Sequence, residues 1–84
     1  MKHFATPEFW ASRAALPAAI RQLADRSFER LERDPSHPAL RLKKVGRYWS
    51  VRVGLHYRAL AVRDEDDLIW FWIGTHAEYD RLIR

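Results

Sequence analysis

The stretch Leu68–Ile73, which reads LIWFWI, is the longest apolar run in the chain and decides how the fold is interpreted. It is far too short to span a bilayer as a helix, which needs about 20 residues. Because every position is apolar, the run predicts a central strand covered on both faces rather than a half-exposed strand of alternating polarity. Left uncovered, such a strand would promote aggregation.

The sequence before this run predicts more strands, joined by short turns. The strands are Leu40–Val45, Tyr48–Leu55 and Tyr57–Arg63, and the turns are Gly46–Arg47, His56–Tyr57 and Asp64–Asp67. Tyr48–Leu55 has the period of two that gives a strand two distinct faces. The expected core-facing side chains are Trp49, Val51 and Val53, and the outward-facing ones Ser50, Arg52 and Gly54.

The first half of the chain predicts a short strand, Lys2–Ala5, followed by two helices. The first helix, Pro7–Ala15, is capped by Thr6 and begins with proline, which is tolerated at the first helical position. The second begins at Pro17 in the same way and ends by Asp34, in a loop that contains two prolines. Its apolar residues trace one stripe at helical spacing: Ile20, Leu23, Ala24, Phe28 and Leu31.

The end of the chain contains the sharpest local signal. Thr75–Glu78 has the sequence of a capping box, so a helix is expected to begin there and run to about Ile83. His76 and Tyr79 then lie on one face of it. The whole order indicates a single α+β domain, residues 1–84. Its helix pair is expected on one face of an antiparallel sheet of three to four strands, with the short helix after the last strand.

The charge distribution indicates a polyanion-binding face. The formal net charge is +4, and Arg41–Arg63 contains seven basic residues and no acidic one. A segment this one-sided favours contact with nucleic acid. The alternative is a sheet edge kept soluble by its charge, because the sign of a charge alone says little about the partner.

Composition excludes several kinds of site. The absence of cysteine rules out disulfides, cysteine-bearing zinc sites and thiol catalysis. His3, His37 and His56 show no metal-ligand spacing, so we expect neither a metal nor a cofactor. The N-terminal MKHFATPEFW lacks the apolar stretch of a signal peptide. We therefore expect a soluble cytoplasmic protein with no membrane contact.

Four segments in the second half resemble the RelE/ParE superfamily of toxins. They are His37–Lys44 (HPALRLKK), Tyr48–Val53 (YWSVRV), His56–Leu60 (HYRAL) and Trp70–Tyr79 (WFWIGTHAEY). The resemblance implies the toxin of a type II toxin–antitoxin system, which forms an oligomer with a cognate antitoxin that wraps it. RelE-like members cut mRNA on the ribosome without a metal ion, whereas ParE-like members inhibit DNA gyrase and cleave nothing.

The resemblance and the chemistry of RNA cleavage together indicate the catalytic candidates. Arg58, at the family's recurring strand arginine, is expected to stabilise charge on the phosphate, and Arg52 to share its basic face. His76 is expected to transfer a proton, and Tyr79 to stack on a base or orient the phosphate. The expected phosphate contacts are Arg41, Lys43, Lys44 and Arg47, with Lys44 preferred over Lys43 at the site.

Each catalytic candidate has an ordinary structural alternative. For Arg58 it is an ion pair with Asp64–Asp67, and for Arg52 a solvent-facing position on the sheet. For His76 it is a structural role in the turn, and for Tyr79 it is hydrophobic docking of the last helix.

The sequence departs from RelE-like relatives at two points, and three functions stay open. Ser50 stands where some relatives have a second basic residue, and Gly74–His76 is less basic than is common there. The functions are an mRNA endonuclease, a gyrase inhibitor, and a basic binding module without toxicity. His76 beside Arg58 favours the first, because an inhibitor needs no acid–base group.

Overall fold

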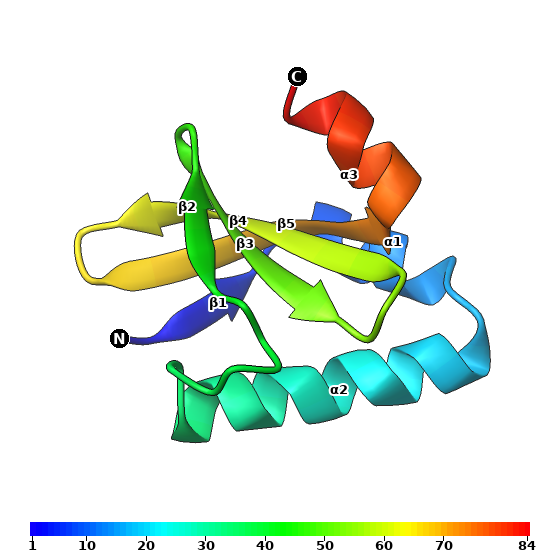
Figure 1. Cartoon of the computed structure of the whole chain (residues 1–84), viewed down its shortest axis with the longest axis horizontal. Coiled ribbons are helices and arrows are strands. Elements are labelled where there is room, and N and C mark those ends of the chain that lie inside the picture. The colour runs from blue at the N-terminus through cyan, green and yellow to red at the C-terminus, as the bar shows by residue number, and fades with distance from the viewer.

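Five strands and three helices follow the predicted order along the chain (Figure 1). The computed structural model describes all residues, 1–84. The elements are β1 (His3–Ala5), α1 (Pro7–Ala14), α2 (Ala18–Arg33), β2 (Lys43–Val45), β3 (Tyr48–Val53), β4 (Tyr57–Asp64), β5 (Asp67–Thr75) and α3 (His76–Leu82). The predicted α+β class is confirmed, with the helix pair before the sheet and a short helix after it. None of the helices has the length and apolar character needed to cross a bilayer.

The sheet is mixed and has five strands, in the order β1-β5-β4-β3-β2. Strands β2 to β5 are antiparallel, as predicted, but β1 pairs with β5 in parallel. The expected antiparallel sheet of three to four strands is therefore confirmed as β2 to β5, and the predicted short first strand joins it through a parallel pairing that the sequence did not indicate. Parallel pairing needs a long connection, and the pattern within a strand does not show which distant strand it will join.

Strand β5 is central, as its uninterrupted apolar run predicts. It has β1 and β4 as neighbours, and both α1 and α2 pack on one of its faces. Trp70 is only 2% exposed and meets Phe28 of α2 edge to face at 5.2 Å between ring centroids. Phe28 in turn meets Phe9 of α1 at 5.4 Å. These rings form the centre of the main core, between the helix pair and the sheet.

A β-bulge in β5 changes which side chains reach that core. Leu60 of β4 pairs with Trp72, but the next residue, Ala61, pairs with Trp70, so Phe71 has no partner. The extra residue shifts the alternation of the strand. Trp70 and Ile73 are three positions apart, yet both are buried at 2% exposure and belong to the main core.

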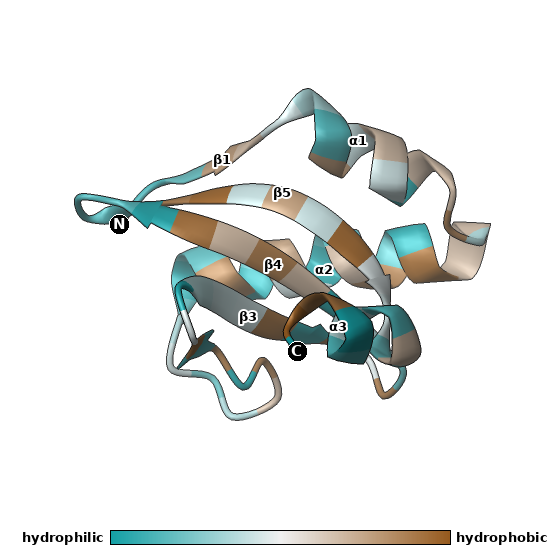
Figure 2. Ribbon diagram, turned by 90° about the horizontal axis from the view of Figure 1, so that it is seen from above, coloured by the Kyte–Doolittle hydropathy of each residue, from teal (hydrophilic) through white to brown (hydrophobic).

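Helix α3 lies across the other face of the sheet from α2 (Figures 1 and 2). The predicted capping box is present: Glu78 N donates to Thr75 Oγ1 at 3.2 Å, and Thr75 N donates to Glu78 Oε1 at 3.0 Å. Tyr79 is the buried residue of the helix, at 5% exposure, and Leu60 of β4 is buried outside the main core. The helix therefore docks over β4 and β5 through its aromatic side chain.

Two strand boundaries differ from the prediction because the backbone turns left-handed. The strand expected over Leu40–Val45 begins only at Lys43, since Arg41 has a φ of 47° and interrupts the extended chain. Strand β3 ends at Val53, because Gly54 has a φ of 63°. A Cβ at this glycine would lie 2.5 Å from the side chain of Leu23 on α2, so the residue also permits close packing. The other boundaries agree within two residues.

The free energy of unfolding is expected to fall as the pH drops below the normal pKa of histidine, about 6.5. His3 Nδ1 accepts a hydrogen bond from Trp70 Nε1 at 3.0 Å, which a ring protonated at Nδ1 cannot do. Burial lowers the pKa of His3, while Glu32 and Asp67 raise it in part. Since the folded state binds protons less readily, this stabilisation is complete above the unfolded pKa and is lost as pH falls through the folded pKa.

Urea denaturation of wild type and of His3→Asn at about pH 7.5 and about pH 5.5 measures this effect. Asparagine keeps an acceptor near the indole but does not titrate, so the variant should lose less stability between the two conditions. His56→Asn, at an exposed position with no side-chain hydrogen bond, serves as the control and should behave as wild type. An unchanged pH dependence in His3→Asn would remove His3 as its source.

Candidate functional site

Arg52 and Arg58 lie directly opposite each other on neighbouring strands. They are register partners in the β3–β4 pair, so both side chains leave the same face of the sheet. Arg52 Nε donates to Gly54 O at 3.0 Å, and Arg58 Nη1 donates to Tyr57 O at 2.9 Å. Like charges in this position destabilise a sheet. Packing therefore gives no reason for the pair, whereas an anionic ligand that bridges the two guanidinium groups does.

The paired arginines have no acidic partner. The ion pairs of the protein are Arg13–Asp25, Arg63–Asp66 and His76–Asp80. The ion-pair alternative for Arg58, with the acidic β4–β5 turn, is therefore wrong, because Arg63 makes that contact. The two guanidinium groups keep N–H donors and positive charge available for phosphate oxygens.

Partial burial and two neighbouring arginines both lower the pKa of Arg58. Burial lowers the pKa of its guanidinium, and the charges of Arg52 and Arg41 lower it further, while Tyr79 and Asp80 raise it. An arginine stays protonated at neutral pH even so. Arg41, Arg52 and Arg58 are therefore close enough to repel one another, and Asp80 offsets this only in part. A bound anion would relieve their mutual repulsion.

The start of α3 brings His76 to the same end of the sheet. Arg58 is paired with Gly74, two residues before His76, and the His76 N–H donates to His56 O in the β3–β4 turn at 2.7 Å. Helix and turn are thus tied together beside the arginines. The register thus places the backbone of His76 at the end of β4 that carries Arg58.

Asp80 orients the imidazole of His76. The distance from His76 Nδ1 to Asp80 Oδ2 is 3.1 Å, and the His76 side chain is 47% exposed. A carboxylate at Nδ1 favours the tautomer that carries its hydrogen there, which leaves Nε2 as a proton acceptor. Asp80 is not among the residues that the sequence analysis singles out. Its spacing of four residues from His76 is the signal that identifies it.

Tyr79 does not offer a ring surface to a ligand. It is 5% exposed, and its ring centroid lies 5.8 Å from that of His76. The burial excludes stacking on an RNA base and agrees with the alternative, hydrophobic docking of α3. An effect of its hydroxyl on a bound phosphate stays a prediction.

The remaining basic residues divide between two parts of the surface. Lys43 pairs with Ser50, which shares a face with Arg52, whereas Lys44 pairs with Trp49, which packs against the main core. The preference for Lys44 at the site is therefore wrong, because a short strand shows no face until its register is known.

Arg41 and Arg47 are at different distances from the paired arginines. The Arg52 N–H donates to Leu40 O at 2.7 Å, which holds the residue before Arg41 against β3. Arg47 lies over the Tyr48 ring at 5.3 Å, and four residues of extended strand, about 13 Å, separate Tyr48 from Arg52. Arg47 is thus outside the cluster, and phosphate contact by either residue stays a prediction.

The whole chain contains no group of three His, Asp or Glu side chains that could hold a metal ion. The charged residues grouped at this end of the sheet are Arg41, Arg52, Arg58, His76 and Asp80, hereafter the basic cluster.

An α+β arrangement of three helices and a five-stranded mixed sheet is the fold of RelE-like toxins. Three solved structures share it. A chain of the RelB–RelE antitoxin–toxin complex from Methanococcus jannaschii has a TM-score of 0.74 and 19% identity, over 96% of this chain and 99% of that one. The YoeB/ParE toxin from Agrobacterium tumefaciens has a TM-score of 0.65 and 16% identity, over 90% and 99%. The isolated E. coli RelE toxin has 0.63 and 9%, over 96% and 94%.

The sequence itself matches the ParE-like toxin domain over residues 18–81. The chain belongs to this family and is a toxin of the RelE/ParE class. The matched range runs from the start of α2 into α3 and includes every residue of the basic cluster. No curated protein matches the chain.

Proposed function

We propose that this toxin cleaves mRNA on the ribosome, without a metal ion, and that the basic cluster is its active site. The observation that supports the proposal is the uncompensated Arg52–Arg58 pair beside a histidine oriented by a carboxylate. Binding alone would need the charges but not an oriented proton acceptor. With ribosome-bound mRNA as its target, the protein would act in the cytoplasm.

The proposed reaction uses the RNA's own 2′-hydroxyl as the nucleophile. His76 Nε2 takes its proton while the 2′-oxygen bonds to phosphorus, and the bond from phosphorus to the 5′-oxygen breaks. The leaving oxygen takes a proton from water, and the products are a cyclic phosphate and a 5′-hydroxyl. Arg52 and Arg58 hold the non-bridging oxygens, where negative charge increases in the transition state.

We also propose a cognate antitoxin as the partner, because the M. jannaschii structure is an antitoxin–toxin complex. The antitoxin and toxin would form a larger assembly in which the basic cluster is blocked or distorted. Arg41 and Lys43 would contact RNA phosphates next to the cleaved bond, and Lys44 and Arg47 would contact phosphates farther from it.

The test is to add purified protein to ribosomes stalled on a defined mRNA and to map the 5′ ends of the fragments. Cleavage in the A site is expected with wild type, and a loss of at least about 100-fold with His76→Ala, equivalent to about 2.7 kcal/mol. His37→Ala, in the loop after α2, is the matched control and should cleave as wild type. A folded wild type that leaves the mRNA intact would contradict the proposal.

Inhibition of DNA gyrase is the second candidate function. The matched family is ParE-like, and Ser50 supplies no charge where some RelE-like relatives have a basic residue. A supercoiling assay separates the two, because an inhibitor of this kind should act in the absence of ribosomes and should not depend on His76.

A further inference from the structure

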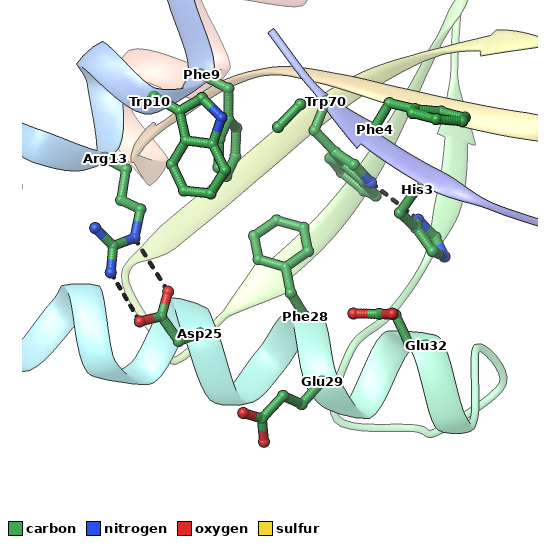
Figure 3. A pocket seen from close by; sticks show the side chains of 11 residues that line it. His3, Phe4, Phe9, Trp10, Arg13, Asp25, Phe28, Glu29, Glu32 and Trp70 are labelled. Carbon is green, nitrogen blue, oxygen red and sulfur yellow. Dashed lines mark hydrogen bonds and ion pairs between the residues drawn. The ribbon is translucent and has the colours of Figure 1, made fainter. Parts of the chain in front are cut away.

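A hollow lies on the helix side of the sheet, away from the basic cluster (Figure 3). It has a volume of about 300 Å³ and is bounded by β1, α1 and α2. Phe9, Phe28 and Trp70 form its inner wall, and Trp10 stands at its mouth. Phe4 contributes to the edge of the hollow from β1, but its ring points away to the other face of the sheet (Figure 3). Trp10 is 56% exposed, so a large aromatic side chain next to an aromatic hollow is left in water.

The rim of this hollow is acidic, although the protein as a whole is basic. Three carboxylates from α2 line it: Asp25, Glu29 and Glu32. Asp25 makes a bidentate pair with Arg13, at 2.7 and 3.0 Å. Glu29 and Glu32 have no ion-pair partner. The carboxylate of Glu32 is directed into the hollow, whereas that of Glu29 lies on the outer side of α2 (Figure 3). The rim therefore carries unpaired negative charge next to exposed aromatic surface.

We propose that this hollow, the aromatic groove, binds a basic and apolar segment of a partner polypeptide. An aliphatic or aromatic side chain of the segment fills the space over Phe28 and Trp70 and covers Trp10. A lysine or arginine a few positions away pairs with Glu29 or Glu32. Its cation does not need the Trp10 ring, over which Arg13 already lies at 5.9 Å. The inference does not depend on RNA cleavage, because it concerns the opposite side of the sheet and needs no catalysis.

The sign of the rim selects a basic peptide over the other ligands of such a protein. RNA carries a negative charge at every phosphate and would be repelled by Glu29 and Glu32. An acidic peptide would be drawn instead to the basic cluster. The two faces therefore differ in partner as well as in position.

The test is selection of peptides from a displayed library of random 12-residue sequences, with wild-type protein as bait. Selected peptides are expected to carry an apolar side chain close to Lys or Arg. Their affinity should fall at least 10-fold for Trp10→Ala and for the double variant Glu29→Lys with Glu32→Lys. The control, Asp64→Lys with Glu65→Lys, reverses the same number of exposed charges outside the groove and should bind as wild type.

Indole N–H resonances locate the bound peptide, because Trp10 and Trp70 line the groove whereas Trp49 and Trp72 do not. The first two signals are expected to shift. Recovery of no peptide, recovery of neutral or acidic peptides, equal affinity for the rim variants, or shifts confined to Trp49 and Trp72 would each overturn the inference. Thermal unfolding of every variant shows that a lost affinity is not a lost fold.

Discussion

Replacing Arg58 with alanine is expected to reduce mRNA cleavage at least about 100-fold, or about 2.7 kcal/mol of transition-state stabilisation, and to leave the protein at least as stable as wild type. The loss of activity follows from the position of Arg58, which faces Arg52 across two strands and has no acidic partner. The stability follows from the same geometry, since alanine removes a like-charge pair and the burial of a charged group. If Arg58 only stabilised the fold, its replacement by alanine would lower the free energy of unfolding and leave cleavage by the folded protein unchanged.

Cleavage of ribosome-bound mRNA and urea denaturation of the same preparations test both halves of this prediction. Arg58→Lys keeps the charge but not the planar fork, so it should recover only part of the activity. Arg63→Ala, farther along β4 and paired with Asp66, is the matched control and should cleave as wild type. The role of Arg58 is excluded by full activity in Arg58→Ala, or by an equal loss in Arg63→Ala.

Trp70→Ala should cause the largest loss of stability from a single substitution, about 3–5 kcal/mol. Trp70 is 2% exposed, contacts Phe28 at 5.2 Å and donates its indole N–H to His3. Total stabilities of small domains are about 5–15 kcal/mol, so this loss would remove most of the folding free energy of a domain near the lower end of that range. At about 4–8 °C per kcal/mol, the midpoint of thermal unfolding should fall by more than about 12 °C.

Trp10→Ala is the matched control for this substitution, because the same side chain is removed from a position that is 56% exposed. It should cost less than about 1 kcal/mol, as exposed substitutions do. Chemical denaturation monitored by circular dichroism measures both variants. Equal losses at the two positions would contradict the central place given to Trp70 in the core.

Local signals in the sequence predicted most of the elements correctly. The Thr75–Glu78 capping box depends on residues three apart, and the alternation in Tyr48–Leu55 on a period of two, so neither needs knowledge of distant contacts. The position of Arg52 and Arg58 on one face followed from alternation together with the resemblance. These are the parts of the site that a single strand or helix determines.

The errors concern contacts between distant segments. The parallel pairing of β1 with β5 and the register that places Lys43 beside Ser50 are properties of two strands together. The bulge at Phe71 also depends on the partner strand, because a continuous apolar run conceals an extra residue. Of the two roles expected for Tyr79, stacking on a base is excluded and docking of α3 is confirmed, because α3 needs one large apolar side chain to dock.

The pairing of β1 with β5 also has a consequence for the order in which the protein folds. His3 and Leu68 are neighbours in the sheet but 65 residues apart in the chain. Contacts of such long separation form late, because closing the loop between them costs conformational entropy before the contact contributes any favourable free energy. A growing chain would therefore carry the apolar stripe of α2 for a long time without a sheet to cover it. The arginines and His76 come together only when β3, β4 and α3 have all been made. A partially synthesised toxin is thus expected to be vulnerable to proteolysis and, under the proposed function, unable to cleave mRNA.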